Sequence, residues 1–224
     1  MIALRNLQIG YRQRKKAIPV FSGLNAEFGA GELVGLMGDN GVGKSTLLKT
    51  ITGTLPALSG GVWLNGKNIG AYTASELAQQ LSIVVTERIG GFNLTARDVV
   101  ASGRIPYINV FGKLSPADEA IVAQSLEQMG IAALGDKAVD ELSDGQRQKV
   151  MIAKSLAQQT PVIILDEPTA FLDYNSKHQL FRILKALCEE QQKLIIVSSH
   201  DLDLMKPYIH RSLTMEEGNV MRLT

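Results

Sequence analysis

Short apolar runs of strand length alternate with helical patterns along most of the chain. Three of these runs are almost wholly apolar and predict strands buried on both faces, at residues 33–37, 162–165 and 194–198. A further strand is predicted at residues 81–85. Helical patterns cover residues 44–52, 75–80, 146–158 and 175–190. Strands that alternate with helices predict an α/β fold with a mainly parallel sheet.

Two parts of the chain depart from this alternation. Residues 3–11, 20–28 and 62–64 are strand-like and separated by glycines, so we expect antiparallel strands on the flank of the main sheet. The basic run at residues 12–16 lies between two of them and predicts a solvated hairpin tip. Residues from about 87 to 158 are mostly helical and predict a helical subdomain inserted into a single domain that spans residues 1–224.

The inserted region carries its own helix signals. Its pattern is helical from residue 94 to about residue 130, with a loop expected around Pro106 and Gly112. Ser115 followed by Pro116 is typical of a helix start, because the serine side chain caps the first turn and proline fits there.

A glycine-rich turn between the first buried strand and a helix fits the pattern G-x-x-x-x-G-K-[ST]. Its residues are Gly38, Asp39, Asn40, Gly41, Val42, Gly43, Lys44, Ser45 and Thr46. Glycines let successive backbone N–H groups turn toward phosphate oxygens, and the helix that follows adds its partial positive end. Lys44 supplies a cation for the β- and γ-phosphates, and Ser45 a hydroxyl for Mg²⁺. The turn therefore predicts a P-loop NTPase core.

The apolar strand at residues 162–165 ends in two acids, Asp166 and Glu167. Acids at strand ends are common loop residues, but beside a phosphate loop they have a cationic partner in Mg²⁺. We expect Asp166 to hold Mg²⁺ and Glu167 to polarise the water that attacks the γ-phosphate.

Composition narrows the class of protein. The 224 residues include 23 Lys and Arg and 22 Asp and Glu, a net charge of +1, which does not favour broad binding to nucleic acid. The lone cysteine excludes an intrachain disulfide, and no apolar stretch reaches the ~20 residues that span a bilayer. The start of the chain lacks the order of a secretion signal, so we expect any membrane role to come through a partner.

The segment Leu-Ser-Asp-Gly-Gln at residues 142–146 resembles the Leu-Ser-Gly-Gly-Gln signature of the ABC (ATP-binding cassette) ATPases. Other motifs agree in order: Tyr11 resembles the adenine-stacking aromatic, residues 171–173 the D-loop, and His200 the switch histidine that senses the γ-phosphate. The resemblance implies a homodimer that binds ATP and Mg²⁺. In it, the signature residues Ser143, Asp144, Gly145 and Gln146 of one copy close on the nucleotide of the other.

Two positions depart from the family pattern. Glu87 stands where the family has a glutamine that touches Mg²⁺, and Asp144 replaces the first glycine of the signature. We expect Glu87 still to sense the metal. The side chain of Asp144 must point away from the phosphate, because repulsion would otherwise weaken the closed dimer.

Within the family, this chain most resembles importer cassettes. Gly145 follows Lys44 by 101 positions, which leaves no room for the coiled coil of repair members, and residues 94–107 resemble the iron-siderophore, haem and cobalamin importers. We therefore expect a peripheral ATPase on the cytoplasmic face of the cell membrane. It would drive a separate permease, which a periplasmic or lipid-anchored substrate-binding protein supplies. The alternative is a non-transport ATPase that acts on protein or nucleic acid. Nothing in the sequence identifies the transported molecule.

Overall fold

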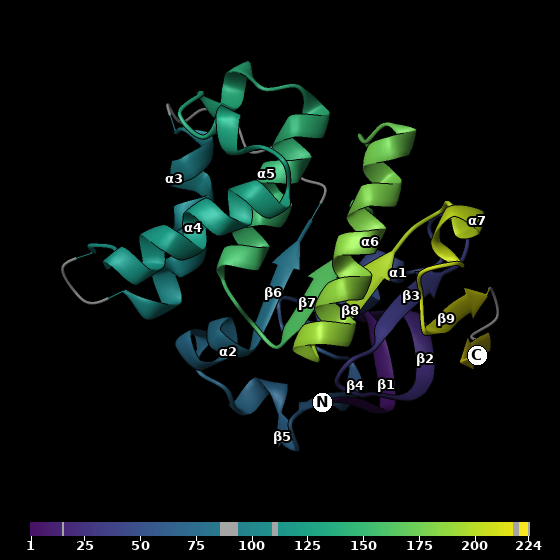
Figure 1. The fold of residues 1–224 in the computed structure, drawn as a ribbon. Coiled ribbons are helices and arrows are strands. Elements are labelled where there is room, and N and C mark those ends of the chain that lie inside the picture. The colour runs from purple at the N-terminus through teal and green to yellow at the C-terminus, as the bar shows by residue number, and fades with distance from the viewer. Residues whose placement is uncertain (15, 86–93, 109–111, 217–219, 224) are drawn as a thin grey trace.

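The computed structural model describes residues 1–14, 16–85, 94–108, 112–216 and 220–223. Its larger sheet has six strands in the order β10-β9-β3-β8-β7-β6 (Figure 1), and all neighbours except β10 and β9 pair in parallel. The bounds are β3 Leu33–Met37, β6 Leu81–Val84, β7 Val162–Leu165, β8 Leu194–Ser198, β9 Arg211–Glu216 and β10 Val220–Leu223. The mainly parallel α/β fold expected from the sequence is confirmed.

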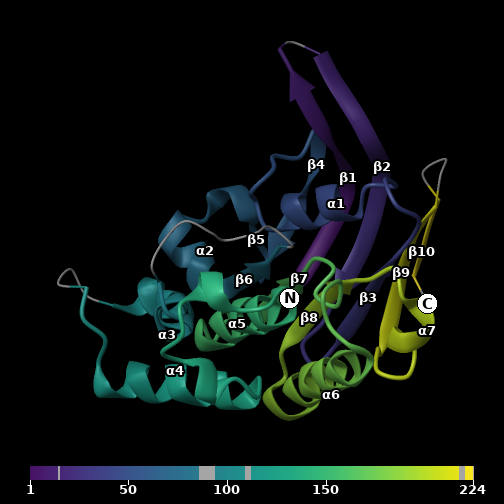
Figure 2. The ribbon, with the colours of Figure 1, turned by 90° about the horizontal axis from the view of Figure 1, so that it is seen from above.

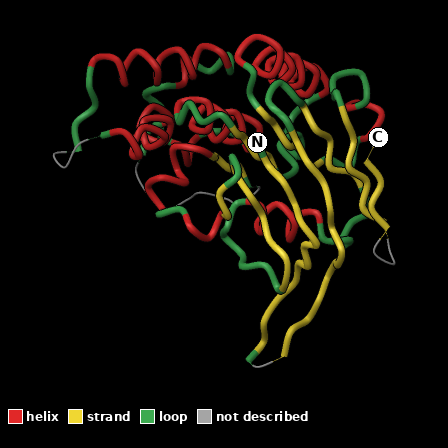
Figure 3. Tube along the Cα trace, turned by 90° about the horizontal axis from the view of Figure 1, so that it is seen from below, coloured by secondary structure: helices red, strands yellow, loops and turns green. Residues whose placement is uncertain are grey.

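A second sheet is antiparallel, with strands in the order β2-β1-β4-β5. Its strands are β1 Ile2–Gln13, β2 Lys16–Phe28, β4 Ser59–Leu64 and β5 Lys67–Asn68. The pairing of β1 with β2 continues to Gln13 and Lys16, so the basic run stands at the end of a hairpin, as predicted. Figures 2 and 3 show this hairpin extending well beyond the body of the molecule.

The described helices lie between successive parallel strands along the chain. The α-helices are α1 Lys44–Ile51, α2 Ala74–Gln80, α3 Ala96–Ala101, α4 Pro116–Gln128, α5 Asp144–Ala157, α6 Tyr174–Gln191 and α7 Leu202–Met205. The 3₁₀ helices are η1 Ile69–Ala71, η2 Ser102–Tyr107, η3 Ala132–Leu134 and η4 Val139–Glu141. The loop expected around Pro106 is instead the 3₁₀ helix η2, which contains that proline. Among the described residues, none of the helices combines the length and the apolar character needed to cross a bilayer.

The parallel sheet separates two apolar cores. Along β7, Ile163 and Leu165 face a core shared with α3, α4, α5 and α6, whereas Val162 and Ile164 face a core shared with α1 and the antiparallel sheet. Alternate side chains of a strand point to opposite faces, so an apolar run buries both. We call α3, η2, α4, α5 and α6 the helical group. Figure 2 shows the resulting layers, with the helical group on one side and α1 with the antiparallel sheet on the other.

A buried ion pair joins two elements of the helical group. Arg104 of η2 donates from Nε to Asp118 Oδ1 of α4 at 2.8 Å, and both residues are buried. Asp118 also accepts hydrogen bonds from the backbone and hydroxyl of Ser115, the predicted cap of α4. These bonds from Ser115, and then Arg104, lower the pKa of Asp118 to about 2.

Asp118 should therefore make a contribution to the free energy of unfolding that is lost in acid. Because its pKa is lower in the folded than in the unfolded chain, its stabilisation is present above about pH 4 and is lost as the pH falls toward 2. Urea unfolding should show Asp118→Asn less stable than the parent at about pH 6, with the difference shrinking by about pH 3. Asp136→Asn, whose carboxylate is exposed, is the matched control and should show no such trend. A pH-independent difference for Asp118→Asn would contradict the assignment.

Candidate nucleotide-binding site

The glycine-rich turn follows β3 and leads directly into α1. Gly38 and Gly43 have φ values of 140° and 113°, where side chains are strained. A Cβ on Gly38 would lie 2.4 Å from the carbonyl oxygen of Met215, and one on Gly43 would lie 2.7 Å from a methyl of Val20. Both positions therefore require glycine.

Lys44 is the first residue of α1 and is buried, with 6% of its surface exposed. Its ammonium group donates to the carbonyl oxygens of Gly38 at 2.6 Å and Asp39 at 3.1 Å. A buried cation is costly without such partners. The two hydrogen bonds hold the charge across the mouth of the turn, beside the N-terminus of α1, where an anion is favoured.

The two acids after β7 are tied to the end of β8. Ser198 donates to Asp166 Oδ1 at 2.7 Å and accepts from the backbone N–H of Glu167 at 2.9 Å. Glu167 has a φ of 49°, an uncommon conformation for a residue with a side chain. His200 Nδ1 lies 2.8 Å from Glu167 Oε2. Because a carboxylate only accepts, the proton of this hydrogen bond belongs to His200.

Tyr11 lies on β1, is 46% exposed, and shares a hydrogen bond of 3.0 Å with the hydroxyl of Thr46 in α1. Ile18 is its direct partner on β2, so both side chains project from the same face of the hairpin. Ile18 is also exposed. The two form an apolar platform beside the helix that starts at Lys44. The sequence analysis missed Ile18, because only the register of the hairpin places it beside Tyr11.

The signature residues form the start of α5. Ser143 caps the helix by accepting from the N–H of Gln146, whose side chain accepts from the N–H of Ser143. Asp144 forms an ion pair with Arg147 on its own helix at 3.2 Å. A Cβ on Gly145 would lie 2.8 Å from the carbonyl oxygen of Phe171, so the signature packs against the loop after β7. The helix starts two residues before the predicted position, because the Ser143 cap initiates it.

The glycine-rich turn and the signature belong to opposite sides of the parallel sheet. α1 packs in the core shared with the antiparallel sheet, and α5 packs in the core shared with α6 (Figure 1). The structure thus brings Tyr11 to the glycine-rich turn through its hydrogen bond with Thr46. It also brings Asp166, Glu167 and His200 together at the ends of β7 and β8. It places Ser143 in the helical group on the other face.

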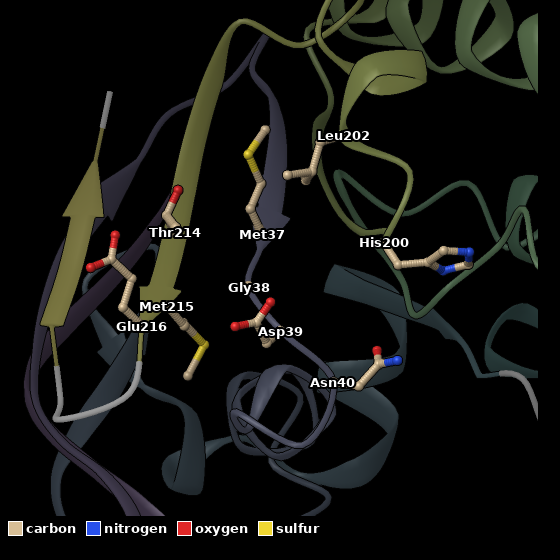
Figure 4. A pocket seen from close by; sticks show the side chains of 9 residues that line it. All are labelled: Met37, Gly38, Asp39, Asn40, His200, Leu202, Thr214, Met215 and Glu216. Carbon is tan, nitrogen blue, oxygen red and sulfur yellow. The ribbon is translucent and has the colours of Figure 1, made fainter.

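A cavity of about 470 Å³ opens beside the first half of the turn. It is lined by Met37, Gly38, Asp39, Asn40, His200, Leu202, Thr214, Met215 and Glu216. Figure 4 shows Asp39 pointing toward β9 and Asn40 pointing toward the side on which His200 lies. Strand β9 therefore forms one wall of the space next to the phosphate turn.

The donor set near the turn fits Mg²⁺ by its chemistry. The hydroxyl of Ser45 is exposed at the start of α1, and the carboxylate of Asp166 ends β7. Both are oxygen donors, and Mg²⁺ in nucleotide sites takes one or two such protein ligands together with phosphate oxygens and water. Glu87, the third predicted ligand, lies outside the described residues.

A phosphate turn between a parallel strand and a helix, with two acids at the end of another parallel strand of the same sheet, defines the class of P-loop nucleoside triphosphatases. Within this class, a helix that starts with the signature residues, as α5 does after its Ser143 cap, is typical of the ABC ATPases. The family model for ABC transporters matches residues 21–170, and the chain belongs to that family. It is an ABC ATPase.

Similar proteins and similar solved structures support this assignment to the ABC ATPases. The chain is 43% identical over 204 residues to the ABC transporter ATP-binding protein MJ0873 of Methanocaldococcus jannaschii, covering 91% of this chain and 69% of the relative. It is 34% identical over 221 residues to the iron(3+)-hydroxamate import ATP-binding protein FhuC of Bacillus subtilis, covering 99% and 81%. The dimeric cassette MJ0796, solved in a post-hydrolysis state with ADP and Pi, superposes with a TM-score of 0.87. It is 27% identical, and the match covers 100% of this chain and 98% of that one.

Ser198 is a residue of the site that the sequence analysis missed. Removing its hydroxyl in Ser198→Ala takes a hydrogen bond from Asp166 and another from the backbone of Glu167. We expect the ATPase kcat to fall roughly tenfold or more, because Ser198 holds both acids that follow β7 in position. The matched control is Ser82→Ala, which removes a buried hydroxyl from β6, where it bonds to Ser155. Equal activity of the two variants, at comparable stability, would contradict the role of Ser198.

Proposed function

We propose that this chain is the ATP-hydrolysing subunit of an ABC importer, which dimerises on Mg-ATP to drive a separate permease. One observation supports the proposal above the others. The buried Lys44 is hydrogen-bonded to the turn that follows β3. Glu167 follows β7 and His200 follows β8, and the two side chains are hydrogen-bonded across these adjacent strands. Lys44, Glu167 and His200 therefore follow strands of one sheet, and this arrangement supports assigning phosphate binding and hydrolysis to that edge of the sheet.

Nucleotide binding follows from the turn. Its backbone N–H groups and Lys44 bind the β- and γ-phosphates, and the adenine lies against Tyr11 and Ile18. The residues assigned to the nucleotide are Tyr11, Gly38 to Thr46, and the partner copy's signature residues 143–146. Ser45 and Asp166 hold Mg²⁺, which supplies charge neutralisation at the phosphates when bound.

Hydrolysis is assigned to Glu167. Its carboxylate accepts a proton from the attacking water, and its unusual backbone conformation, fixed by the hydrogen bond to Ser198, aims the side chain. His200 holds the Glu167 carboxylate through Nδ1 and presents Nε2 on the far side of its ring. His200 thus links the position of the carboxylate to the loop after β8.

The second copy completes the site. Within one copy, the Ser143 cap belongs to the helical group, on the sheet face opposite α1. A head-to-tail pair brings the cap of one copy to the γ-phosphate of the other, because a capped helix start is an anion site. Asp144 is compatible with this role, since Arg147 draws its carboxylate along the chain's own helix. The dimeric state of the similar MJ0796 cassette supports the arrangement.

Import is the transport direction that the relatives favour. FhuC is named for iron(3+)-hydroxamate import. We assign this chain a permease of the iron-siderophore, haem or cobalamin class and a place on the cytoplasmic face of the membrane. A substrate-binding protein acts on the other side of that permease.

Glu167→Gln should trap the dimer. The amide keeps the shape of the carboxylate but does not accept the proton of water, so hydrolysis should slow by about a hundredfold or more. Sizing chromatography with Mg-ATP should then show a dimer that the parent protein does not accumulate. Adding Lys44→Ala should abolish it, because the phosphates lose their cation. A Glu167→Gln protein that stays monomeric with bound ATP would contradict the proposed function.

The importer assignment has a separate test. Affinity purification of the chain from detergent-solubilised membranes of its native cells should recover a multi-span membrane protein. ATP hydrolysis by that complex should rise with a ferric hydroxamate, haem or cobalamin and its binding protein. Recovery of nucleic acid or of a soluble partner alone would instead support the non-transport alternative.

A further inference from the structure

The 3₁₀ helix η2 lies in direct backbone contact with the end of α5. A Cβ on Gly103 would lie 2.4 Å from the carbonyl oxygen of Lys154, so only glycine permits this approach. Tyr107, the last residue of η2, donates its hydroxyl to the carbonyl oxygen of Gln158 at 2.9 Å. The two ends of η2 are thus fixed on the last turn of α5 and the residue that follows it.

Arg104 makes the central contact of this joint. Its Nη1 donates to the carbonyl oxygen of Ala157, the last residue of α5, at 2.7 Å, and to Gln159 Oε1 at 3.1 Å. Its Nε pairs with Asp118, and its guanidinium lies 4.2 Å from the ring centre of Tyr107. A cation at the C-terminus of a helix also meets the negative end of the helix dipole.

An apolar side chain would hold these elements together at lower cost in desolvation. Buried ion pairs add little net stability compared with well-packed apolar residues, but they demand a particular geometry. The planar guanidinium donates in fixed directions to α4, to the end of α5 and to Gln159. The contact is therefore suited to fixing the position of η2 against α5.

α5 connects this joint to the signature. The helix runs 14 residues from Asp144 to Ala157, a length of about 20 Å. Ser143 caps one end, and Arg104 holds the other. Between the two anchors of η2, Ile105 is 62% exposed, which puts a surface residue at the far end of the helix that carries the cap.

We propose that Arg104 is a positioning residue that couples the exposed helix η2 to Ser143 through α5. A displacement of η2 then moves the cap that meets the second copy's nucleotide, and nucleotide-driven closure moves η2. The inference rests on the proposed dimer and adds to it the residue that transmits motion between its surface and its nucleotide.

The test places a fluorophore on η2 by the substitution Ile105→Cys, since the chain's own Cys188 is buried. In a Glu167→Gln background, Mg-ATP should change the emission of the label as the dimer forms. Adding Arg104→Met should reduce that change by about twofold or more, while sizing chromatography still shows the ATP-bound dimer. Arg104→Lys, which keeps the charge but not the planar fork, should restore part of the response.

The matched control is Arg97→Met on the neighbouring helix α3, which breaks an exposed pair with Asp136 at 3.8 Å. It should leave the response unchanged. A full response in Arg104→Met would overturn the coupling, and where that variant does not fold, a full response in Arg104→Lys would overturn it. Failure of the Glu167→Gln protein itself to dimerise would overturn the proposed function, and the coupling with it.

Discussion

The site depends on holding charged groups in fixed positions beside a dry sheet. Lys44 and Asp166 are both buried, and the strands that precede them, β3 and β7, consist almost wholly of apolar residues. Each is held by a short hydrogen bond to its own chain, Lys44 to Gly38 and Asp166 to Ser198. Unpaired, either charge would cost several kcal/mol, roughly the whole margin of stability of a small domain. The phosphate turn and the end of β8 are arranged to prevent this.

The same sheet divides the chemistry between two faces. The phosphate turn leads into α1 on one side, and the Ser143 cap stands on α5 on the other. Such a division is the reason for proposing that a nucleotide on the turn takes its remaining contacts from a second copy. The helical group carries the helix start capped by Ser143 at one end of α5 and the buried Arg104 at the other.

Local motifs were predictable from the sequence, and register was not. The turn at Gly38 to Thr46 and the acids after β7 depend on neighbouring residues, so a pattern finds them. The pairing of Tyr11 with Ile18 depends on how β1 and β2 align. The role of Ser198 depends on β8 lying next to β7. Both pairings, one in each sheet, exist only in the folded chain.

Two further features were missed for different reasons. Strand β9 alternates buried Leu213 and Met215 with partly exposed residues, a signal that was present but short. The buried Arg104 carried no signal, since arginine usually marks a surface, and its partner Asp118 is 14 residues away. Glu87, where the sequence departs from its family, lies outside the described residues and keeps its predicted role untested.

The most direct measurement is a structure of this protein with Mg²⁺ and a non-hydrolysable ATP analogue. We predict two copies, with the terminal phosphate beside Lys44 of one copy and within about 3 Å of the Ser143 hydroxyl of the other. A terminal phosphate contacted by a single copy, with both Ser143 hydroxyls facing solvent, would contradict the account.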